Sequence, residues 1–201
     1  MKTEIEVKFL NVDFDEVRAK LLSLGGVCEE PMRLMRRVLV DIHQRTPEED
    51  YSSFLRLRDE GGKVTLTLKE FRDKSISGAS EREIVVSDFD ETKTILEGVG
   101  VKFSTFQESK RETWRIGEVE VVLDEWPWIP RYIEIEGPTE ALVEQTAEQL
   151  GFDWSNAVFG SVDVIYAQQF PNREVRGVID IGEVRFGDPV PAVFHPEESV
   201  Q

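Results

Sequence analysis

Charged and apolar residues alternate along short segments of the first 136 residues, and this alternation constrains the fold more than any other feature. Successive side chains of a β-strand point to opposite faces, so the pattern predicts strands with one apolar and one charged face. Short connections between most of them favour antiparallel pairing. Eight such segments are present: Glu4–Phe9, Arg36–Asp41, Leu55–Arg58, Val64–Lys69, Glu81–Val86, Lys110–Ile116, Glu118–Asp124 and Arg131–Glu136.

Three helices are predicted, each after a strand that carries a Glu-x-Glu pair. Each begins at a capping side chain and ends at a glycine, as helices commonly do. The expected helices run from Asp13 to Gly25, from Asp88 or Asp90 to Gly98, and from Thr139 to Gly151. After Pro171 glycine and proline become frequent. We therefore expect a domain over residues 1–170 and an extension over 171–201, with short strands near 178–181 and 183–186 and a loose tail.

Acidic residues outnumber basic ones by 40 to 24, which gives a net charge of −16. This charge repels nucleic acid and anionic membranes, so neither is an expected partner. No stretch approaches the roughly 20 apolar residues that cross a bilayer. The N-terminus lacks the apolar run of a signal peptide, so we expect a cytoplasmic protein. The single cysteine, Cys28, is expected to be a packed small residue.

The charged strand faces carry an unusual chemistry. Taken singly, each is explained by a solvated sheet face. Paired carboxylates on one face, however, repel each other unless a cation or a metal lies nearby. If the charged faces point into a closed barrel of eight strands, the lumen suits one small ligand. Carboxylates would bind a hard divalent cation such as Mg²⁺ or Mn²⁺, and arginine and lysine would bind phosphate oxygens. With only His43 and His195 present, a histidine-rich zinc site is not expected.

The sequence resembles the CYTH superfamily, the triphosphate tunnel metalloenzymes, over roughly residues 3–170. The first match is the ExExK signature at Glu4-Ile5-Glu6-Val7-Lys8. Further matches follow in the family's order at Leu55-Arg56-Leu57-Arg58, Thr67-Leu68-Lys69, Glu81-Arg82-Glu83, Lys110-Arg111, Leu123-Asp124 and Glu134-Ile135-Glu136-Gly137. The resemblance implies an α+β fold, in which a closed eight-stranded antiparallel barrel forms a triphosphate tunnel with helices packed outside.

The resemblance also implies roles for individual residues. Metal ligands or water-organising groups would be Glu4, Glu6, Glu81, Glu83, Asp124, Glu134 and Glu136. Phosphate oxygens would be bound by Lys8, Arg56, Arg58, Lys69, Lys110 and Arg111, joined by Arg37 or its neighbour Arg36. Glu4, Glu6 and Lys8 are the candidate catalytic residues. Val7 departs from the family's tripolyphosphatases, which usually have arginine there.

Three functions compete. The first is metal-dependent hydrolysis of tripolyphosphate, thiamine triphosphate or a nucleoside triphosphate such as ATP. The second is a class IV adenylyl cyclase, which forms cyclic AMP and pyrophosphate and needs a purine pocket. Aromatic residues that could line one, or belong to the core, are Phe54, Phe71, Phe103, Phe106, Trp114, Trp126 and Trp128. The third is a module that binds polyphosphate or nucleotide without turnover. A monomer or a homodimer is expected.

Overall fold

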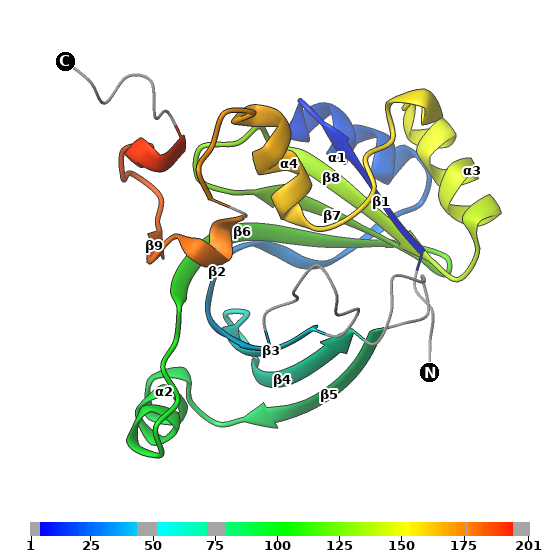
Figure 1. The fold of residues 1–201 in the computed structure, drawn as a ribbon. Coiled ribbons are helices and arrows are strands. Elements are labelled where there is room, and N and C mark those ends of the chain that lie inside the picture. The colour runs from blue at the N-terminus through cyan, green and yellow to red at the C-terminus, as the bar shows by residue number, and fades with distance from the viewer. Residues whose placement is uncertain (1–4, 44–51, 72–78, 176, 195–201) are drawn as a thin grey trace. The chain divides into compact units, whose positions relative to one another are not determined.

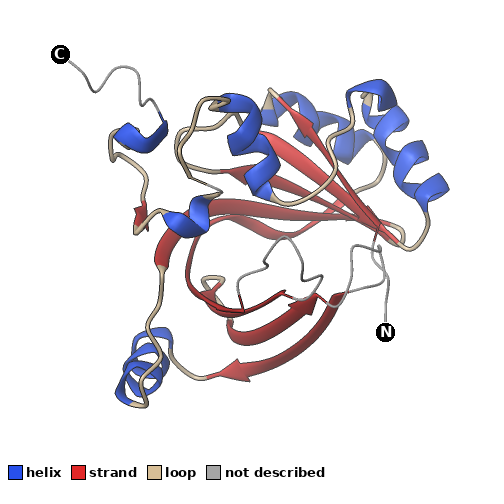
Figure 2. Ribbon diagram, viewed as in Figure 1, coloured by secondary structure: helices blue, strands red, loops and turns tan. Residues whose placement is uncertain are grey.

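The computed structural model describes residues 5–43, 52–71, 79–175 and 177–194 (Figure 1). The strands are β1 (Ile5–Leu10), β2 (Val27–His43), β3 (Ser52–Asp59), β4 (Val64–Phe71), β5 (Ala79–Val86), β6 (Thr105–Ile116), β7 (Val119–Glu125), β8 (Tyr132–Gly137) and β9 (Glu183–Val184). The α-helices are α1 (Phe14–Ser23), α2 (Phe89–Gly98), α3 (Glu140–Leu150) and α4 (Val162–Gln169). Short 3₁₀ turns are η1 (Trp154–Asn156), η2 (Val178–Asp180) and η3 (Ala192–Phe194). Figure 2 distinguishes the helices from the strands by colour.

The strands are hydrogen-bonded in the order β1-β8-β7-β6-β2-β3-β4-β5, and β9 joins β6 in parallel. The α+β class and a large, mainly antiparallel sheet are therefore confirmed. Among the described residues no hydrogen-bonded ladder joins β1 to β5, so these ladders do not close the sheet into the expected barrel. A closed tunnel stays a prediction from the sequence.

The chain divides into two compact units. The first unit comprises Leu34–Glu108 and Val175–Asp188, and the second comprises Lys2–Arg33, Ser109–Glu174 and Pro189–Gln201. Both β2 and β6 begin in one unit and end in the other. The segment after Pro171, expected to be a separate extension, contributes residues to both units.

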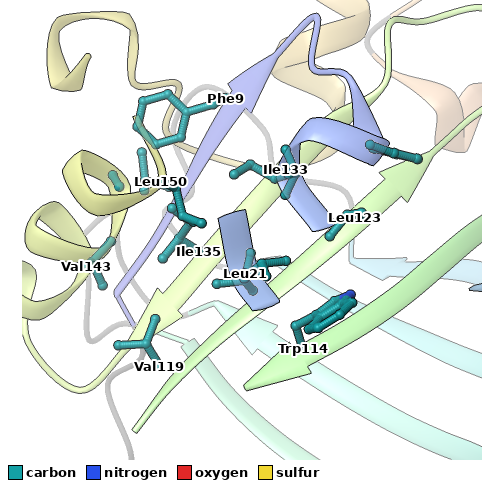
Figure 3. Close-up of a cluster of buried hydrophobic side chains, with 14 residues drawn as sticks. Phe9, Leu21, Trp114, Val119, Leu123, Ile133, Ile135, Val143 and Leu150 are labelled. Atoms are coloured by element: carbon teal, nitrogen blue, oxygen red, sulfur yellow. The ribbon is translucent and has the colours of Figure 1, made fainter. Parts of the chain in front are cut away.

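In the second unit, helices α1 and α3 cover the apolar face of β1, β8, β7 and β6. Asp13 accepts hydrogen bonds from the first turn of α1, and Thr139 does the same for α3, so both expected caps are present. Gly151 ends α3 with a φ of 92°, in the left-handed region that favours glycine. Figure 3 shows the resulting core, in which Leu21 of α1 and Val143 of α3 pack against strand residues such as Ile135.

In the first unit, α2 covers one face of the β2-β3-β4-β5 ladder. Phe89 of α2 packs against Val38 and Leu57, with Leu66 and Val86 beside them. Asp88 caps the helix by accepting a hydrogen bond from Glu91 N–H. The opposite face of this ladder carries the charged residues of the alternation.

The described residues after Pro171 are held by packing and are not all loose. Phe194 of η3 is 1% exposed and stacks 4.5 Å from Phe170 and 5.7 Å from Tyr166, between ring centroids. The strand expected near 178–181 is the turn η2, and the strand expected over 183–186 is only the two residues of β9. Short elements like these depend on tertiary contacts that sequence periodicity does not show.

The sequence predicted a packed environment for Cys28. Cys28 is exposed at the start of β2 and is not a packed core residue, so that expectation is wrong. It lies in a run, residues 27–31, that is exposed throughout, so the start of the strand precedes the covered part of the sheet. No helix among the described residues is long and apolar enough to cross a membrane.

Candidate functional site: two charged sheet faces

One face of the second unit's sheet brings together the charged residues of β1, β8, β7 and β6. In the antiparallel register, Glu6 is opposite Glu136 and Lys8 is opposite Glu134. Asp124 is likewise opposite Arg111 in the neighbouring ladder. Residues directly opposite each other share a face, so these side chains all lie on the side away from the apolar core. We call this set the acidic face: Glu6, Lys8, Arg111, Asp124, Glu134 and Glu136.

Lys8 is the central cation of the acidic face. Its Nζ lies 2.8 Å from Glu6 Oε1 and 2.8 Å from Glu134 Oε2, and the residue is only 2% exposed. Burial alone would lower the pKa of Lys8, but the charges of Glu134 and Glu6 and their hydrogen bonds outweigh it and raise that pKa. Lys8 is therefore a protonated ammonium at neutral pH, and it cannot accept a proton there.

Arg111 holds Asp124, the buried carboxylate of this face. Its Nε donates to Asp124 Oδ1 at 2.7 Å and its Nη2 to Asp124 Oδ2 at 2.5 Å, the two-pronged geometry that suits a carboxylate. Burial opposes the charge of Arg111, but Asp124 raises the pKa of Arg111 well above its ordinary value. Nη2 is also 3.9 Å from Glu134 Oε1, so Arg111 and Lys8 both contact Glu134.

Three carboxylates of the acidic face could hold a metal ion. One oxygen each of Glu6, Glu134 and Glu136 lies within 4.8 Å of the others. All donors are oxygens, which suits Mg²⁺ or Mn²⁺ better than zinc. With their carboxylates ionised, the six residues of the acidic face have four negative and two positive formal charges, an excess of two that a divalent cation would neutralise. Glu120 and Arg115, which lie on the same face and are 2.9 Å apart, offset each other. The residues present therefore fit the predicted metal.

The charged face of the first unit is dominated by cations. Arg37 is opposite Arg58 in the β2-β3 ladder, and Arg56 is opposite Thr67 in the β3-β4 ladder. Like charges directly opposite each other destabilise a sheet unless an anion compensates. We call this set the arginine face: Arg37, Arg56, Arg58, Thr65, Thr67, Lys69, Glu81 and Glu83.

Three polar atoms of the arginine face are buried and have no hydrogen-bond partner among the described residues. They are Arg56 Nε, Arg58 Nε and Thr65 Oγ1. Thr65 is opposite Arg58 in the register, so two of these atoms belong to directly paired residues. Burial, together with the nearby charge of Arg58, lowers the pKa of Arg56 to about 10. Arg58 Nη2 lies 2.5 Å from Glu60 Oε1, but the buried Nε donors of Arg56 and Arg58 have no hydrogen-bond partner among the described residues. Leaving such donors unpaired is costly, and the oxygens of an anion would relieve that cost.

The glutamates of the arginine face have partners other than a metal in this structure. Glu81 Oε1 lies 2.6 Å from Lys69 Nζ, and Glu83 Oε2 accepts a hydrogen bond from Thr67 at 2.9 Å. Burial would raise the pKa of Glu81, but the hydrogen bond and charge of Lys69 outweigh it, so the pKa of Glu81 is lowered. Both were predicted as metal ligands, and neither belongs to the acidic group that could hold an ion among the described residues.

In two pairs of adjacent residues, Arg36-Arg37 and Lys110-Arg111, the two side chains lie on opposite faces of the sheet. Arg36 lies on the α2-covered face, where its Nε donates to Asp59 at 3.0 Å and its guanidinium lies 4.4 Å over the Phe89 ring. Lys110 is opposite Glu125, and their charged atoms lie 3.2 Å apart, on the face away from Arg111. We therefore leave Arg36 and Lys110 out of the candidate site. Glu4 lies outside the described residues.

Neutral residues were missed by the charge pattern. Thr65, Thr67 and Gln107 carry no charge, yet all three are buried polar residues beside the arginines. In the sequence, only the alternation of the β4 segment pointed to Thr65 and Thr67, because it places them on the same face as Lys69. Of the aromatic residues weighed for a purine pocket, Trp114 is a core residue of the second unit, and Phe103 and Phe106 pack against the core of the first unit.

Comparison with known proteins places these features in a family. A family model described as the CYTH domain matches residues 2–155, and the chain belongs to this family. No curated protein gives a match.

Solved structures share the fold at low sequence identity. A proposed adenylate cyclase of Vibrio parahaemolyticus is 16% identical with a TM-score of 0.65, over 83% of this chain and 98% of that one. The protein PH1012 of Pyrococcus horikoshii is 22% identical with a TM-score of 0.59, over 77% of this chain and 94% of that one. A proposed adenylate cyclase of Bacillus halodurans is 18% identical with a TM-score of 0.53, over 84% and 97%. These likenesses show the fold alone.

Proposed function

We propose that this protein is a divalent-metal-dependent enzyme that hydrolyses a triphosphate. The observation that carries the proposal is the arginine face, where the buried Nε atoms of Arg56 and Arg58 lack hydrogen-bond partners among the described residues. Phosphate oxygens are the acceptors that arginine recognises best. The CYTH family supports the same substrate class.

In this proposal the acidic face holds Mg²⁺ or Mn²⁺ through Glu6, Glu134 and Glu136. The bound ion would lower the pKa of a water molecule and so supply a nucleophile near neutral pH. Lys8 lies 2.8 Å from a carboxylate oxygen of both Glu6 and Glu134 and fixes the orientation of the two side chains. Because Lys8 is protonated and its pKa is raised, we assign it the role of a fixed positive charge, and we do not assign it the role of a general base.

The alternatives are less well supported. A cyclase needs a purine platform, and three of the aromatic residues considered for one, Phe103, Phe106 and Trp114, pack in the cores. A module that only binds polyphosphate would not need three clustered carboxylates as well as the arginines.

Product analysis tests the proposal. Purified protein is incubated with Mg²⁺ or Mn²⁺ and tripolyphosphate, thiamine triphosphate or ATP. We expect orthophosphate without cyclic nucleotide. Cyclic AMP with pyrophosphate from ATP would instead establish the cyclase, and no product from any substrate would favour the binding module.

The matched variants are Arg56→Ala on the arginine face and Arg82→Ala on the same sheet. Arg82 is exposed and bonded to Glu70 at 2.5 Å, and it is opposite the apolar Leu68. Arg56→Ala should raise KM at least tenfold, since a charge-assisted hydrogen bond contributes about 1.5–3 kcal/mol. Arg82→Ala should leave KM unchanged. An equal KM for both variants would place Arg56 outside the binding site.

A further inference from the structure

Gln107 is a buried neutral residue next to the arginine face that no sequence motif includes. It lies on β6, is 1% exposed and belongs to the first unit, as do all its partners named here. Its Oε1 accepts a hydrogen bond from Arg37 Nε at 2.8 Å. Its Nε2 donates to the Val178 carbonyl at 3.2 Å and to Thr105 Oγ1 at 3.3 Å.

These partners permit only one orientation of the amide. A guanidinium only donates hydrogen bonds, so the oxygen of Gln107 must face Arg37. A backbone carbonyl only accepts them, so the nitrogen must face Val178. A flipped amide would lose both bonds inside a buried site, which is costly. The Gln107 side chain is therefore a fixed acceptor for Arg37.

The carbonyl that orients Gln107 comes from a segment beyond the residues matched by the family model. Val178 is buried, and Val184 of β9 pairs with Gln107 in the parallel ladder. The Phe106 N–H also donates to the Gly182 carbonyl at 2.9 Å, which holds the same segment against β6. The segment after residue 155 thus contributes to the arrangement of the arginine face.

We propose that Gln107 is a positioning residue that orients the Arg37 guanidinium for an anionic phosphate ligand. The inference rests on the proposed function, because it needs the arginine face to bind phosphate. Arg37 is opposite Arg58, whose charge repels it, and an arginine side chain has many rotamers. Holding Nε on a buried acceptor fixes the guanidinium before the ligand arrives, which lowers the entropic cost of binding.

Titration calorimetry with tripolyphosphate tests the proposal, in EDTA so that turnover does not occur. The variants are Gln107→Met, Arg37→Ala and the double variant, with Arg56→Ala as the reference for the arginine face. We expect Gln107→Met to weaken Kd about tenfold, comparable with other groups that orient a ligand-binding side chain. In the Arg37→Ala background, Gln107→Met should cause no further loss, since Gln107 acts through Arg37.

The control is Thr146→Val, which removes a buried hydroxyl that donates to Leu142 in α3, at 2.7 Å, away from the arginine face. It should leave Kd unchanged. If Gln107→Met does not fold, Gln107→Ala is the second variant, since it removes the amide that accepts from Arg37 Nε and adds neither charge nor bulk. Two results would overturn this inference alone. One is an additive loss of affinity in the double variant. The other is a normal Kd in a Gln107 variant while Arg56→Ala binds weakly. Binding that Arg56→Ala does not weaken would overturn the proposed function, and this inference with it.

Discussion

At the scale of single residues, Lys8 joins two carboxylates of the acidic face through ion pairs. Its ammonium is buried between Glu6 and Glu134 and lies within 2.8 Å of both. Without it, the carboxylates of Glu6 and Glu134 would repel each other, and only that of Glu6 is well exposed to water. A metal ion could then take over part of the neutralisation, so Lys8 and the metal have overlapping electrostatic effects.

Lys8→Met should therefore destabilise the metal-free protein and increase the stabilisation gained from metal. We expect a loss of roughly 2–4 kcal/mol, below the full cost of breaking a buried pair because Glu6 is partly exposed. Urea unfolding with and without Mn²⁺ measures both quantities, and Lys20→Met, an exposed lysine of α1, is the control. If Mn²⁺ stabilised Lys8→Met no more than the wild type, the carboxylates beside Lys8 would not be metal ligands.

For single residues, charge alternation predicts the sheet face of a side chain in some strands and not in others. Alternation correctly separated Glu6 and Lys8 from the apolar Val7, because β1 is regular. It did not choose between Arg36 and Arg37, since the run Met32-Arg33-Leu34-Met35-Arg36-Arg37 does not alternate and the face depends on the register with β3. Neutral residues such as Gln107 become visible only through their hydrogen bonds.

At the scale of elements, the long strands and the capped helices were predictable from sequence, whereas α4 was not. Helices α1, α2 and α3 each have a side-chain cap at the expected residue. Ser161 precedes α4 without a side-chain cap bond, so local signals are weak there. The helix is held by packing, with Tyr166 donating a hydrogen bond to the Pro127 carbonyl at 2.7 Å. Such long-range contacts cannot be read from periodicity.

One ion pair joins α1 to β6 through the core of the second unit. Arg18 donates to Glu112 Oε1 at 3.0 Å and to Oε2 at 2.9 Å, and Trp114 Nε1 donates to the same carboxylate at 2.6 Å. Burial would raise the pKa of Glu112, but the hydrogen bonds from Arg18 and Trp114 outweigh it and lower that pKa. A carboxylate whose pKa is lower in the folded state stabilises the fold at a pH above the pKa of the unfolded state, which is near 4.5. This stabilisation is lost as the pH falls through the pKa of the folded state.

Glu112→Gln should remove the part of the pH dependence of the unfolding free energy that comes from protonation of Glu112. We expect a loss of about 1–3 kcal/mol at neutral pH, because a charged, buried hydrogen-bond acceptor is weakened. The difference from the wild type should shrink as the pH falls below about 4.5, where the wild-type carboxylate becomes protonated. Urea unfolding between pH 7 and pH 3 measures this, with the exposed Glu16→Gln as control. A difference that stayed constant over that range would show that protonation of Glu112 is not linked to folding.

At the scale of the whole chain, the residues beyond the family match are part of the folded protein. Phe194 is 1% exposed, and its ring packs on Phe170 and Tyr166, with Trp128 at 6.0 Å between centroids. Phe194→Ala should cost about 3–5 kcal/mol, the usual cost of removing a buried aromatic ring. Thermal unfolding measures it, with the exposed Phe159→Ala as control. A loss no larger than that of the control would show that the chain end is not part of the cooperative core.

The net charge of −16 makes the whole molecule sensitive to salt, so metal binding must be separated from screening. If the acidic face binds a divalent ion as proposed, MgCl₂ should raise Tm more than NaCl at matched ionic strength, because Na⁺ would not replace that ion. Ligand at about 100 times its Kd, with Mg²⁺ and tripolyphosphate together, should raise Tm by about 5–10 °C. Glu136→Gln should reduce the rise in Tm that Mg²⁺ causes, and Arg56→Ala should reduce the rise in Tm that tripolyphosphate causes. Equal shifts in MgCl₂ and NaCl would mean that screening alone stabilises the protein, and the three clustered glutamates would then be a charged surface and not a metal site.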